Sequence, residues 1–239
     1  MIHTYEVLDS TQDLAHALAA AGAPHGDAVV AGEQTMGRGT RGRDWASGLG
    51  GLWLSVIIRP SGPPSLEALS VRVGLELAEA LSDLIGSDPV QVKWPNDLVA
   101  RDRKLGGILC ESRWSGDLPS WAVVGVGING RNAVPHELAD SAITMAELSW
   151  NGCLDDLTTV VVRSVVAVAD RRGPLDREEL LRFARRDWLR GKALAMPVTG
   201  IATGIGPEAR LRVEQQSGAI VEVLGSVTLA GLARHPGSR

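Results

Sequence analysis

The sequence predicts an α+β fold followed by a small β-barrel at the C-terminal end. Apolar residues recur at helical spacing over residues 66–84, which is typical of a long amphipathic helix. Short apolar runs bounded by glycine or proline, such as residues 52–59, predict buried strands. Over residues 192–229, valine-rich segments alternate with Gly or Pro, as in a small barrel of roughly four or five strands. We therefore expect a domain boundary near Arg190.

The individual elements follow from their boundary signals. Ser10 and Asp13 fit the capping-box pattern, and Gly22 ends the helix that we expect as the first element. Residues 37–51 are rich in glycine and lack periodicity, so they predict a long loop. The other expected elements are strands over residues 29–34, 90–94 and 121–129, a hairpin of residues 97–100 and 104–112, helices over residues 154–171 and 176–188, a linker over residues 61–65, and a loose tail over residues 233–239.

Composition excludes several classes of protein. The 239 residues contain 24 Lys and Arg against 28 Asp and Glu, and this net charge of −4 argues against general affinity for DNA or RNA. No apolar run reaches the roughly 18 residues of a membrane span, and the first residues lack the pattern of a signal peptide. The two cysteines form no CxxC motif, which favours a reducing cytoplasm. We expect a cytoplasmic protein that binds neither DNA nor a membrane.

Two segments, residues 37–42 and 125–130, match the pattern GxGxxG. Neither lies between a strand and a helix as a dinucleotide-binding fold requires, and the sequence contains no P-loop. In the first segment, glycines let backbone N–H groups approach an anion, and Arg38, Arg41 and Arg43 supply donors for phosphate or carboxylate. A solvated basic loop that merely turns the chain is the alternative, and the loop alone does not decide between them.

A second group of polar residues surrounds a tight turn and the hairpin after it. Asn96 and Asp97 offer oxygen ligands of the kind that Mg²⁺ takes together with substrate phosphates. Lys104 can neutralise charge that develops on a phosphorus centre. An ordinary turn with surface lysines is the alternative, but it leaves the bulky pair Trp94 and Pro95 exposed without purpose.

These motifs resemble those of the biotin protein ligases in order and spacing. The residues that carry the resemblance are Ser10-Thr11, Gln34, Gly37-Arg38-Gly39, Lys93-Trp94-Pro95-Asn96-Asp97, Lys104-Leu105-Gly106-Gly107-Ile108-Leu109 and Gly125-Val126-Gly127-Ile128-Asn129. The resemblance implies the class II synthetase-like biotin/lipoate ligase fold, a central mixed β-sheet packed with helices, and a small C-terminal SH3-like β-barrel. It also implies a catalytic domain over residues 1–190 and the barrel over residues 191–239.

The resemblance further implies an enzyme that activates biotin with ATP and Mg²⁺ to biotinyl-5′-AMP. The enzyme then transfers the biotinyl group to one lysine of a biotin carboxyl carrier protein domain of a carboxylase. Because Ser10 and Thr11 lie almost at the start of the sequence, we expect the monofunctional form without an N-terminal DNA-binding domain, as a monomer or weak homodimer.

Site residues carry over from the family motifs position by position. The resemblance implies that Lys104, Arg38 and Asp97 act in catalysis, with Asp97 also near the metal. The positions implied for biotin are Ser10, Thr11, Gln34, Gly37, Arg38, Trp45, Lys104, Gly107, Gly125 and Gly127. The positions implied for ATP are Arg38, Thr40, Arg41, Lys93, Asn96 and Asn129.

The sequence departs from the family pattern at three places. Thr40 replaces a second loop arginine, Gln12 replaces an asparagine, and residues 141–144 lack the tryptophan that stacks on adenine in some members. Two other functions remain open, namely a ligase for lipoate or another acyl acid and a non-catalytic sensor of biotin or its adenylate. The presence of both Lys104 and Asp97 argues against the sensor.

Overall fold

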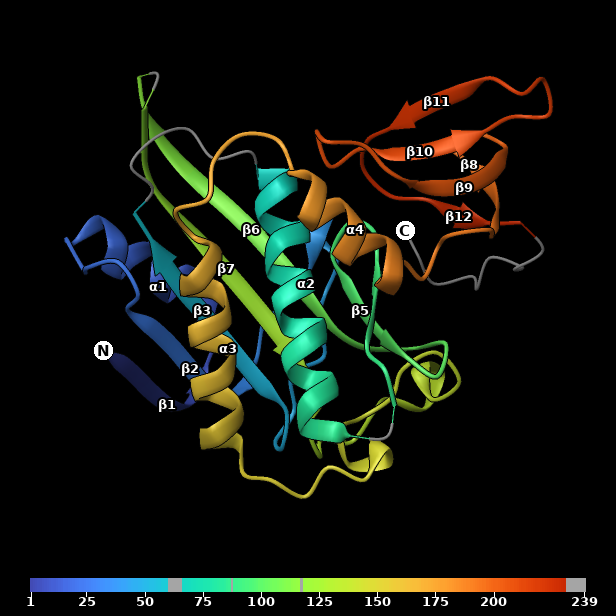
Figure 1. Cartoon of the computed structure of the whole chain (residues 1–239). Helices are drawn as coiled ribbons and strands as arrows, with labels where there is room; N and C mark the ends of the chain where they lie inside the picture. The colour runs from blue at the N-terminus through green and yellow to red at the C-terminus, as the bar shows by residue number, and fades with distance from the viewer. Residues whose placement is uncertain (60–65, 87, 117, 231–239) are drawn as a thin grey trace.

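A seven-stranded mixed sheet forms the larger part of the structure, and a five-stranded antiparallel sheet lies beside one end of it (Figure 1). The computed structural model describes residues 1–59, 66–86, 88–116 and 118–230, so the expected linker over residues 61–65 and the expected tail over residues 233–239 lie outside the described residues. The order of the larger sheet is β1-β2-β3-β7-β6-β5-β4. Its strands are β1 (Ile2–Leu8), β2 (Ala28–Gln34), β3 (Leu52–Ile58), β4 (Gln91–Lys93), β5 (Asp97–Ala100), β6 (Arg103–Ser115) and β7 (Leu118–Ile128).

The first element is a strand, not the helix that we expected. β1 pairs with β2 in parallel, whereas the other neighbours in this sheet are antiparallel. The strand lies at the edge of the sheet and most of its side chains are exposed. An edge strand of this kind needs no apolar alternation, so the sequence carries no periodic signal for it.

Helices cover both faces of the larger sheet. Helix α1 (Thr11–Ala20) packs its buried alanines on one face, against Val29, Ile57 and Val123. The opposite face forms the main core with α2 (Leu66–Ile85) and α3 (Leu154–Val168), and α4 (Arg177–Arg186) packs beside α2 (Figure 1). These helices confirm the helical predictions, although α3 ends three residues and α4 two residues before the expected end.

The caps of two helices show where sequence patterns succeed and fail. At α4, Asp176 and Glu179 form the reciprocal hydrogen bonds of a capping box. At α1, Ser10 is the N-cap, but its side chain makes no capping hydrogen bond, so the predicted capping box is wrong. Asp13 instead lies 2.7 Å from the guanidinium of Arg38. The hydroxyl of Ser10 is therefore not used by the helix.

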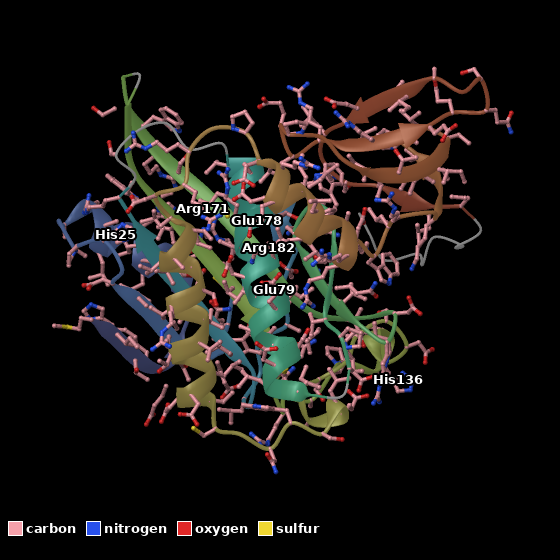
Figure 2. All side chains as sticks on the ribbon, viewed as in Figure 1. His25, Glu79, His136, Arg171, Glu178 and Arg182 are labelled. Carbon is pink, nitrogen blue, oxygen red and sulfur yellow. The ribbon has the colours of Figure 1, made fainter. Side chains whose placement is uncertain are left out.

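Charged pairs tie the outer helices together. Arg182 of α4 donates to Glu79 and Glu76 of α2 at 2.7 Å, and Figure 2 shows Arg182 and Glu79 meeting between these helices. Arg72 of α2 and Glu179 of α4 form a buried pair with a closest distance of 2.8 Å. Because Arg72 also donates to backbone carbonyls before α4, this pair fixes the start of that helix.

The sequence predicts four or five short strands after residue 191, and the structure has five within the described residues. They are β8 (Ala193–Met196), β9 (Gly200–Ile205), β10 (Leu211–Glu214), β11 (Ile220–Val223) and β12 (Thr228–Leu229), in the order β11-β10-β9-β8-β12. Within the described residues β11 and β12 do not pair, so this unit is an open sheet and the predicted barrel is not closed.

Trp94 joins the two sheets. The side chain is buried, and its indole N–H donates to the carbonyl of Ala209 at 2.7 Å. Residues of both sheets belong to one apolar core. The bulky residue after Lys93 therefore has a structural purpose.

Among the described residues, no helix is both long and apolar enough to span a membrane.

Candidate active site

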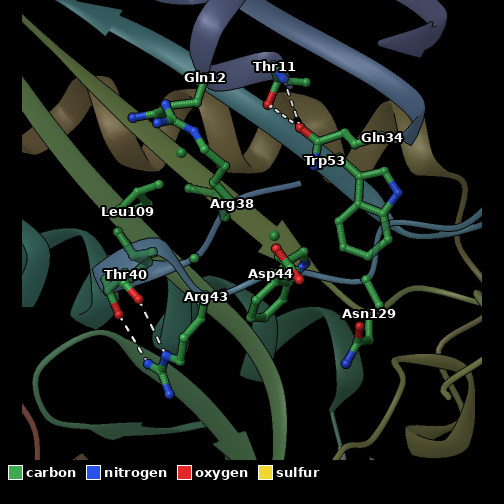
Figure 3. Close-up of a pocket in the computed structure, with 18 of the residues that line it drawn as sticks. Thr11, Gln12, Gln34, Arg38, Thr40, Arg43, Asp44, Trp53, Leu109 and Asn129 are labelled. Carbon is green, nitrogen blue, oxygen red and sulfur yellow. Dashed lines mark hydrogen bonds between the residues drawn. The ribbon is translucent and has the colours of Figure 1, made fainter. Parts of the chain in front are cut away.

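A cavity of about 280 Å³ opens on the α1 face of the larger sheet. It lies between the N-terminus of α1, the ends of β2, β3, β6 and β7, and the glycine-rich loop (Figure 3). Many residues implied by the family motifs line this cavity: Ser10, Thr11, Gln34, Arg38, Thr40, Trp45, Asn96, Lys104, Gly107, Gly125, Gly127 and Asn129. Four others, Gly37, Arg41, Lys93 and Asp97, lie outside its lining.

Three strand glycines make the floor of the cavity flat. Gly107 and Gly127 face each other on β6 and β7, and the indole of Trp45 lies over both. A methyl group added at Gly127 would lie 2.8 Å from that indole, and one added at Gly125 would lie 2.6 Å from Gln12 Oε1. In this structure the glycines therefore make room for side chains of the protein, which motif matching does not reveal.

Trp45 also forms one wall of the cavity. Its ring meets Trp53 edge to face, with centroids 6.5 Å apart, and the ammonium of Lys104 lies 4.7 Å from its centroid. This arrangement places a cation on the aromatic face, where the ring quadrupole attracts it. The loop is anchored through Gly37, which has no room for a side chain against the Trp45 carbonyl.

A continuous polar network lines the end of the cavity at α1. The backbone N–H of Thr11 donates to Gln34 Oε1 at 2.8 Å (Figure 3). Gln34 Nε2 in turn donates to Ser47 at 2.8 Å. The hydroxyls of Thr11 and Ser55 lie 2.9 Å apart, and Ser55 donates to Gln12 Oε1 at 3.0 Å. These contacts hold Thr11 and Gln34 in fixed orientations before any ligand enters.

Three buried polar atoms of residues that line the cavity have no partner within the described residues. They are the hydroxyl of Ser10, the indole N–H of Trp45 and the side-chain oxygen of Asn132. A buried donor or acceptor without a partner costs about 1–3 kcal/mol. Such groups in a cavity wall indicate a ligand that supplies the missing hydrogen bonds.

Lys104 and Asp97 form a close ion pair at the edge of the cavity. Lys104 Nζ lies 2.6 Å from Asp97 Oδ1, and Lys93 Nζ lies 3.6 Å from Asp97 Oδ2. Both oxygens of this carboxylate therefore face lysines. No group of three His, Cys, Asp or Glu side chains suited to a metal occurs in the described part of the chain. Asp97 therefore pairs with lysines in this structure, and its position near a metal stays a prediction.

The carboxyl group of Glu111, beside the cavity, has a strongly lowered pKa. A hydrogen bond from His16, together with one from Gln12 and the charge of Arg38, outweighs burial and lowers its pKa to about 2. Glu111 is therefore ionised at any ordinary pH. Its position opposite Arg38 makes it the counter-charge of the loop arginine.

The other residues that the resemblance implies for ATP contact groups of the protein in this structure. Thr40 accepts a hydrogen bond from Arg43 at 3.2 Å, and Arg41 donates to the hydroxyl of Ser226 in the segment between β11 and β12. Asn96 and Asn129 donate to backbone carbonyls at 2.8 Å and 3.2 Å. Arg41 therefore points away from the cavity, and the two asparagines orient strands around it.

Sequence reasoning missed several residues around the cavity. Ser55 is the one polar residue within the apolar strand β3, and that contrast could have identified it. Gln12 lines the cavity, although we noted it only as a departure from the family pattern. The end away from α1 is aliphatic. No motif identifies its residues Val134, Pro135 and Leu138, whereas Ala142 falls within the segment 141–144 that we compared with the family pattern.

The match to known proteins agrees with this geometry. Residues 4–129 match the sequence profile of the Biotin/lipoate A/B protein ligase family. The chain belongs to this family. The matched range contains the α1 end of the cavity, the glycine-rich loop and Lys104, so the family assignment rests on the same segments that build the site.

Individual relatives extend the likeness. The chain is 34% identical over 203 residues to the bifunctional ligase/repressor BirA of Escherichia coli, covering 80% of this chain and 62% of the relative. It is 37% identical over 139 residues to the biotin–[acetyl-CoA-carboxylase] ligase of Mycobacterium tuberculosis, covering 55% and 50%. The matched region of BirA from Bacillus subtilis spans 45% of that protein's length. The likeness thus covers about half to two thirds of each relative.

Solved structures of this family match nearly the whole chain. The biotin protein ligase of Aquifex aeolicus in complex with biotin and ATP has a TM-score of 0.81 at 27% identity, covering 96% of this chain and 99% of that one. The ligase of Leishmania major in complex with biotinyl-5-AMP has a TM-score of 0.64 at 25% identity, covering 94% and 98%. The mixed sheet and the smaller C-terminal sheet are therefore the family's fold.

Proposed function

We propose that the chain activates biotin with ATP to biotinyl-5′-AMP, releasing pyrophosphate. It then transfers the biotinyl group to a lysine of a biotin carboxyl carrier protein domain. The family assignment supports this proposal, as do relatives named biotin–[acetyl-CoA-carboxylase] ligase. The match to a ligase structure that contains both biotin and ATP supports the choice of substrates.

The unpartnered Ser10 hydroxyl in the cavity carries the proposal most directly. The ureido head of biotin is neutral and polar, so it needs hydrogen-bond partners when buried. Ser10 lies next to Thr11 and Gln34 at the polar end of the cavity. The dithiolane ring of lipoate would leave these groups unsatisfied, which favours biotin over lipoate.

In the first step, a biotin carboxylate oxygen bonds to the α-phosphorus of ATP while the bond to pyrophosphate breaks. Both reactants are anions, so cations at the point of contact lower their repulsion. Lys104 and Arg38 line the cavity and supply two such charges. Lys104 must exchange its contact with Asp97 for the new anion, and this pairing keeps its ammonium oriented until substrate arrives.

In the second step, the neutral amine of the carrier lysine attacks the carbonyl carbon of the mixed anhydride. AMP leaves, the amine loses a proton, and an amide forms. Because the adenylate also reacts with water, a loop that covers it protects the intermediate. The loop that carries Arg38 and Trp45 has this position over the cavity.

The aliphatic end of the cavity suits the adenine base. Leu138 and Ala142 offer apolar surface near Lys104, whose backbone N–H donates to the carbonyl of Ser141 at 2.7 Å. No tryptophan is needed for this packing. Magnesium would enter with the phosphates of ATP, since Asp97 alone does not hold a metal.

The wider setting is also part of the proposal. We propose a catalytic unit over residues 1–190 and a smaller unit over residues 191–239 that assists transfer. A cytoplasmic location fits a sequence with two cysteines that form no CxxC motif. We propose a monomer or weak homodimer, with no DNA or membrane partner, which fits the net charge of −4.

The first half-reaction gives a direct test of substrate. Pyrophosphate release is measured with ATP and either biotin, lipoate or octanoate, each at the same concentration. The proposal predicts release with biotin and little with the other two acids. Preference for lipoate or octanoate would replace the substrate, and binding of biotin without release would identify a sensor.

A further inference from the structure

Glu111 lies on β6 beside the cavity, and neither the motifs nor the proposed chemistry gives it a role. Its Oε2 atom accepts hydrogen bonds from Gln12 Nε2 at 3.1 Å, His16 Nε2 at 3.1 Å and Arg38 Nη2 at 3.2 Å. Two of these donors come from α1 and the third comes from the glycine-rich loop. One carboxylate oxygen thus connects the sheet, the helix and the loop.

The hydrogen bond to His16 has a defined direction. Trp121 Nε1, which can only donate, lies 3.0 Å from His16 Nδ1. His16 Nδ1 must therefore accept, and the ring proton sits on Nε2, where it is donated to Glu111. This chain of Trp121, His16 and Glu111 fixes the carboxylate in one orientation, aimed at the loop.

Arg38 meets this carboxylate with only part of its guanidinium. Its Nη2 contacts Glu111 and also lies 2.7 Å from Asp13 Oδ1. In the described part of the chain, Nε and Nη1 of Arg38 have no protein partner. Arg38 lines the cavity and extends toward Gln12 (Figure 3). The two contacts at Nη2 therefore orient the guanidinium, and Nε and Nη1 remain available to a ligand.

We propose that Glu111 is a positioning residue for Arg38, holding the loop arginine at the cavity before substrate binds. Gln12 and His16 orient Glu111 for this task. The inference rests on the proposed function, because it assigns Arg38 to the anions that react there. It goes beyond the family motifs, which do not include Glu111.

The two carboxylates that hold Arg38 differ in their surroundings. The side chain of Glu111 is 28% exposed and that of Asp13 is 61% exposed. Water screens the more exposed pair, and such pairs contribute little. Replacement of Asp13 by asparagine is therefore the matched control, since it removes the same charge from the same arginine at the screened side.

The first experiment needs no activity. Full-length wild type, Glu111→Gln and Asp13→Asn are treated with trypsin without ligand, and cleavage after Arg38 is followed by mass spectrometry. We expect cleavage in Glu111→Gln to be about threefold faster or more, because the loop loses its fixed contact. The effect in Asp13→Asn should be smaller. Equal rates in all three proteins would overturn the proposal.

The second experiment is a double-mutant cycle on biotin-dependent pyrophosphate release. Glu111→Gln should lower kcat about 10- to 100-fold, the range expected when a reacting group is misplaced by about 1 Å. In the Arg38→Ala background the same substitution should have little further effect. An undiminished effect there would show that Glu111 acts on the fold and not through Arg38, and would contradict the proposal.

A second variant of Glu111 and the trypsin comparison keep these outcomes separable. If Glu111→Gln does not fold, Glu111→Asp keeps the charge but shortens the reach, and it should show the same non-additivity with a smaller loss. If the wild type releases no pyrophosphate with biotin, the proposed function fails, whereas the trypsin comparison still tests whether Glu111 holds Arg38.

Discussion

Asp187 carries a buried carboxyl group at the junction of α4 and the smaller sheet. Its Oδ1 accepts a hydrogen bond from the backbone N–H of Leu189 at 2.9 Å, whereas Oδ2 has no partner among the described residues. Burial disfavours the charged form more than this hydrogen bond and the charge of Arg190 favour it. The pKa of Asp187 is therefore raised from 3.8 to about 6.

This shift makes the free energy of unfolding depend on pH. Between pH 3.8 and 6 the folded protein binds the proton more tightly than the unfolded chain, so the stability contribution is full below 3.8 and is lost as pH rises through 6. At about 1.36 kcal/mol for each pKa unit, a rise from 3.8 to about 6 corresponds to about 3 kcal/mol over the full range.

We predict that Asp187→Asn removes this dependence. From pH 4 to pH 7.5, the free energy of unfolding of the variant should rise relative to wild type by about 2 to 3 kcal/mol. Urea unfolding followed by tryptophan fluorescence measures it at each pH. Asp187→Ala should share the flatter profile at lower stability, because the N–H of Leu189 loses its acceptor. Parallel profiles of wild type and both variants would show that Asp187 does not cause this dependence of stability on pH.

The other predictions concern the cavity. Lys104→Ala should slow pyrophosphate release about 10²- to 10³-fold at saturating biotin, as loss of one charge-stabilising donor does. Gly127→Val should displace the indole of Trp45 and weaken biotin binding in calorimetry at least about tenfold, whereas Gly48→Ala, with nothing within 4 Å of the added carbon, should not. Ser10→Ala should weaken biotin binding without lowering the urea midpoint, because its hydroxyl has no partner in the protein.

Periodic signals predicted most of the fold. The helices, the strands over residues 52–58 and 97–100, and the five short C-terminal strands follow from apolar spacing and from the glycines between them. β1 escaped because an exposed edge strand has no apolar face to show in the sequence. The capping-box prediction at Ser10 was wrong because the pattern rests on two residue types alone. It does not reveal that the Ser10 side chain lines the cavity and makes no hydrogen bond to the helix.

The motifs predicted several residues that line the cavity, but not the contacts that these residues make with one another. Matching the motifs located Lys104, Arg38 and the strand glycines. Which side chain fills the space above a glycine depends on contacts across strands, so the packing of Trp45 over Gly127 needs the structure. The same holds for Glu111, whose three donors come from segments up to 99 residues away.

Transfer of labelled biotin to a carrier domain is the most direct measurement of the proposed ligase activity. The purified chain is mixed with ATP, labelled biotin and a biotin carboxyl carrier protein domain, and the label on the carrier is located by mass spectrometry. A carrier whose acceptor lysine is replaced by arginine serves as the control. We expect ATP-dependent label on that one lysine and none on the arginine carrier. Absence of label on an intact carrier, from a chain that is folded and binds biotin and ATP, would contradict the proposed activity.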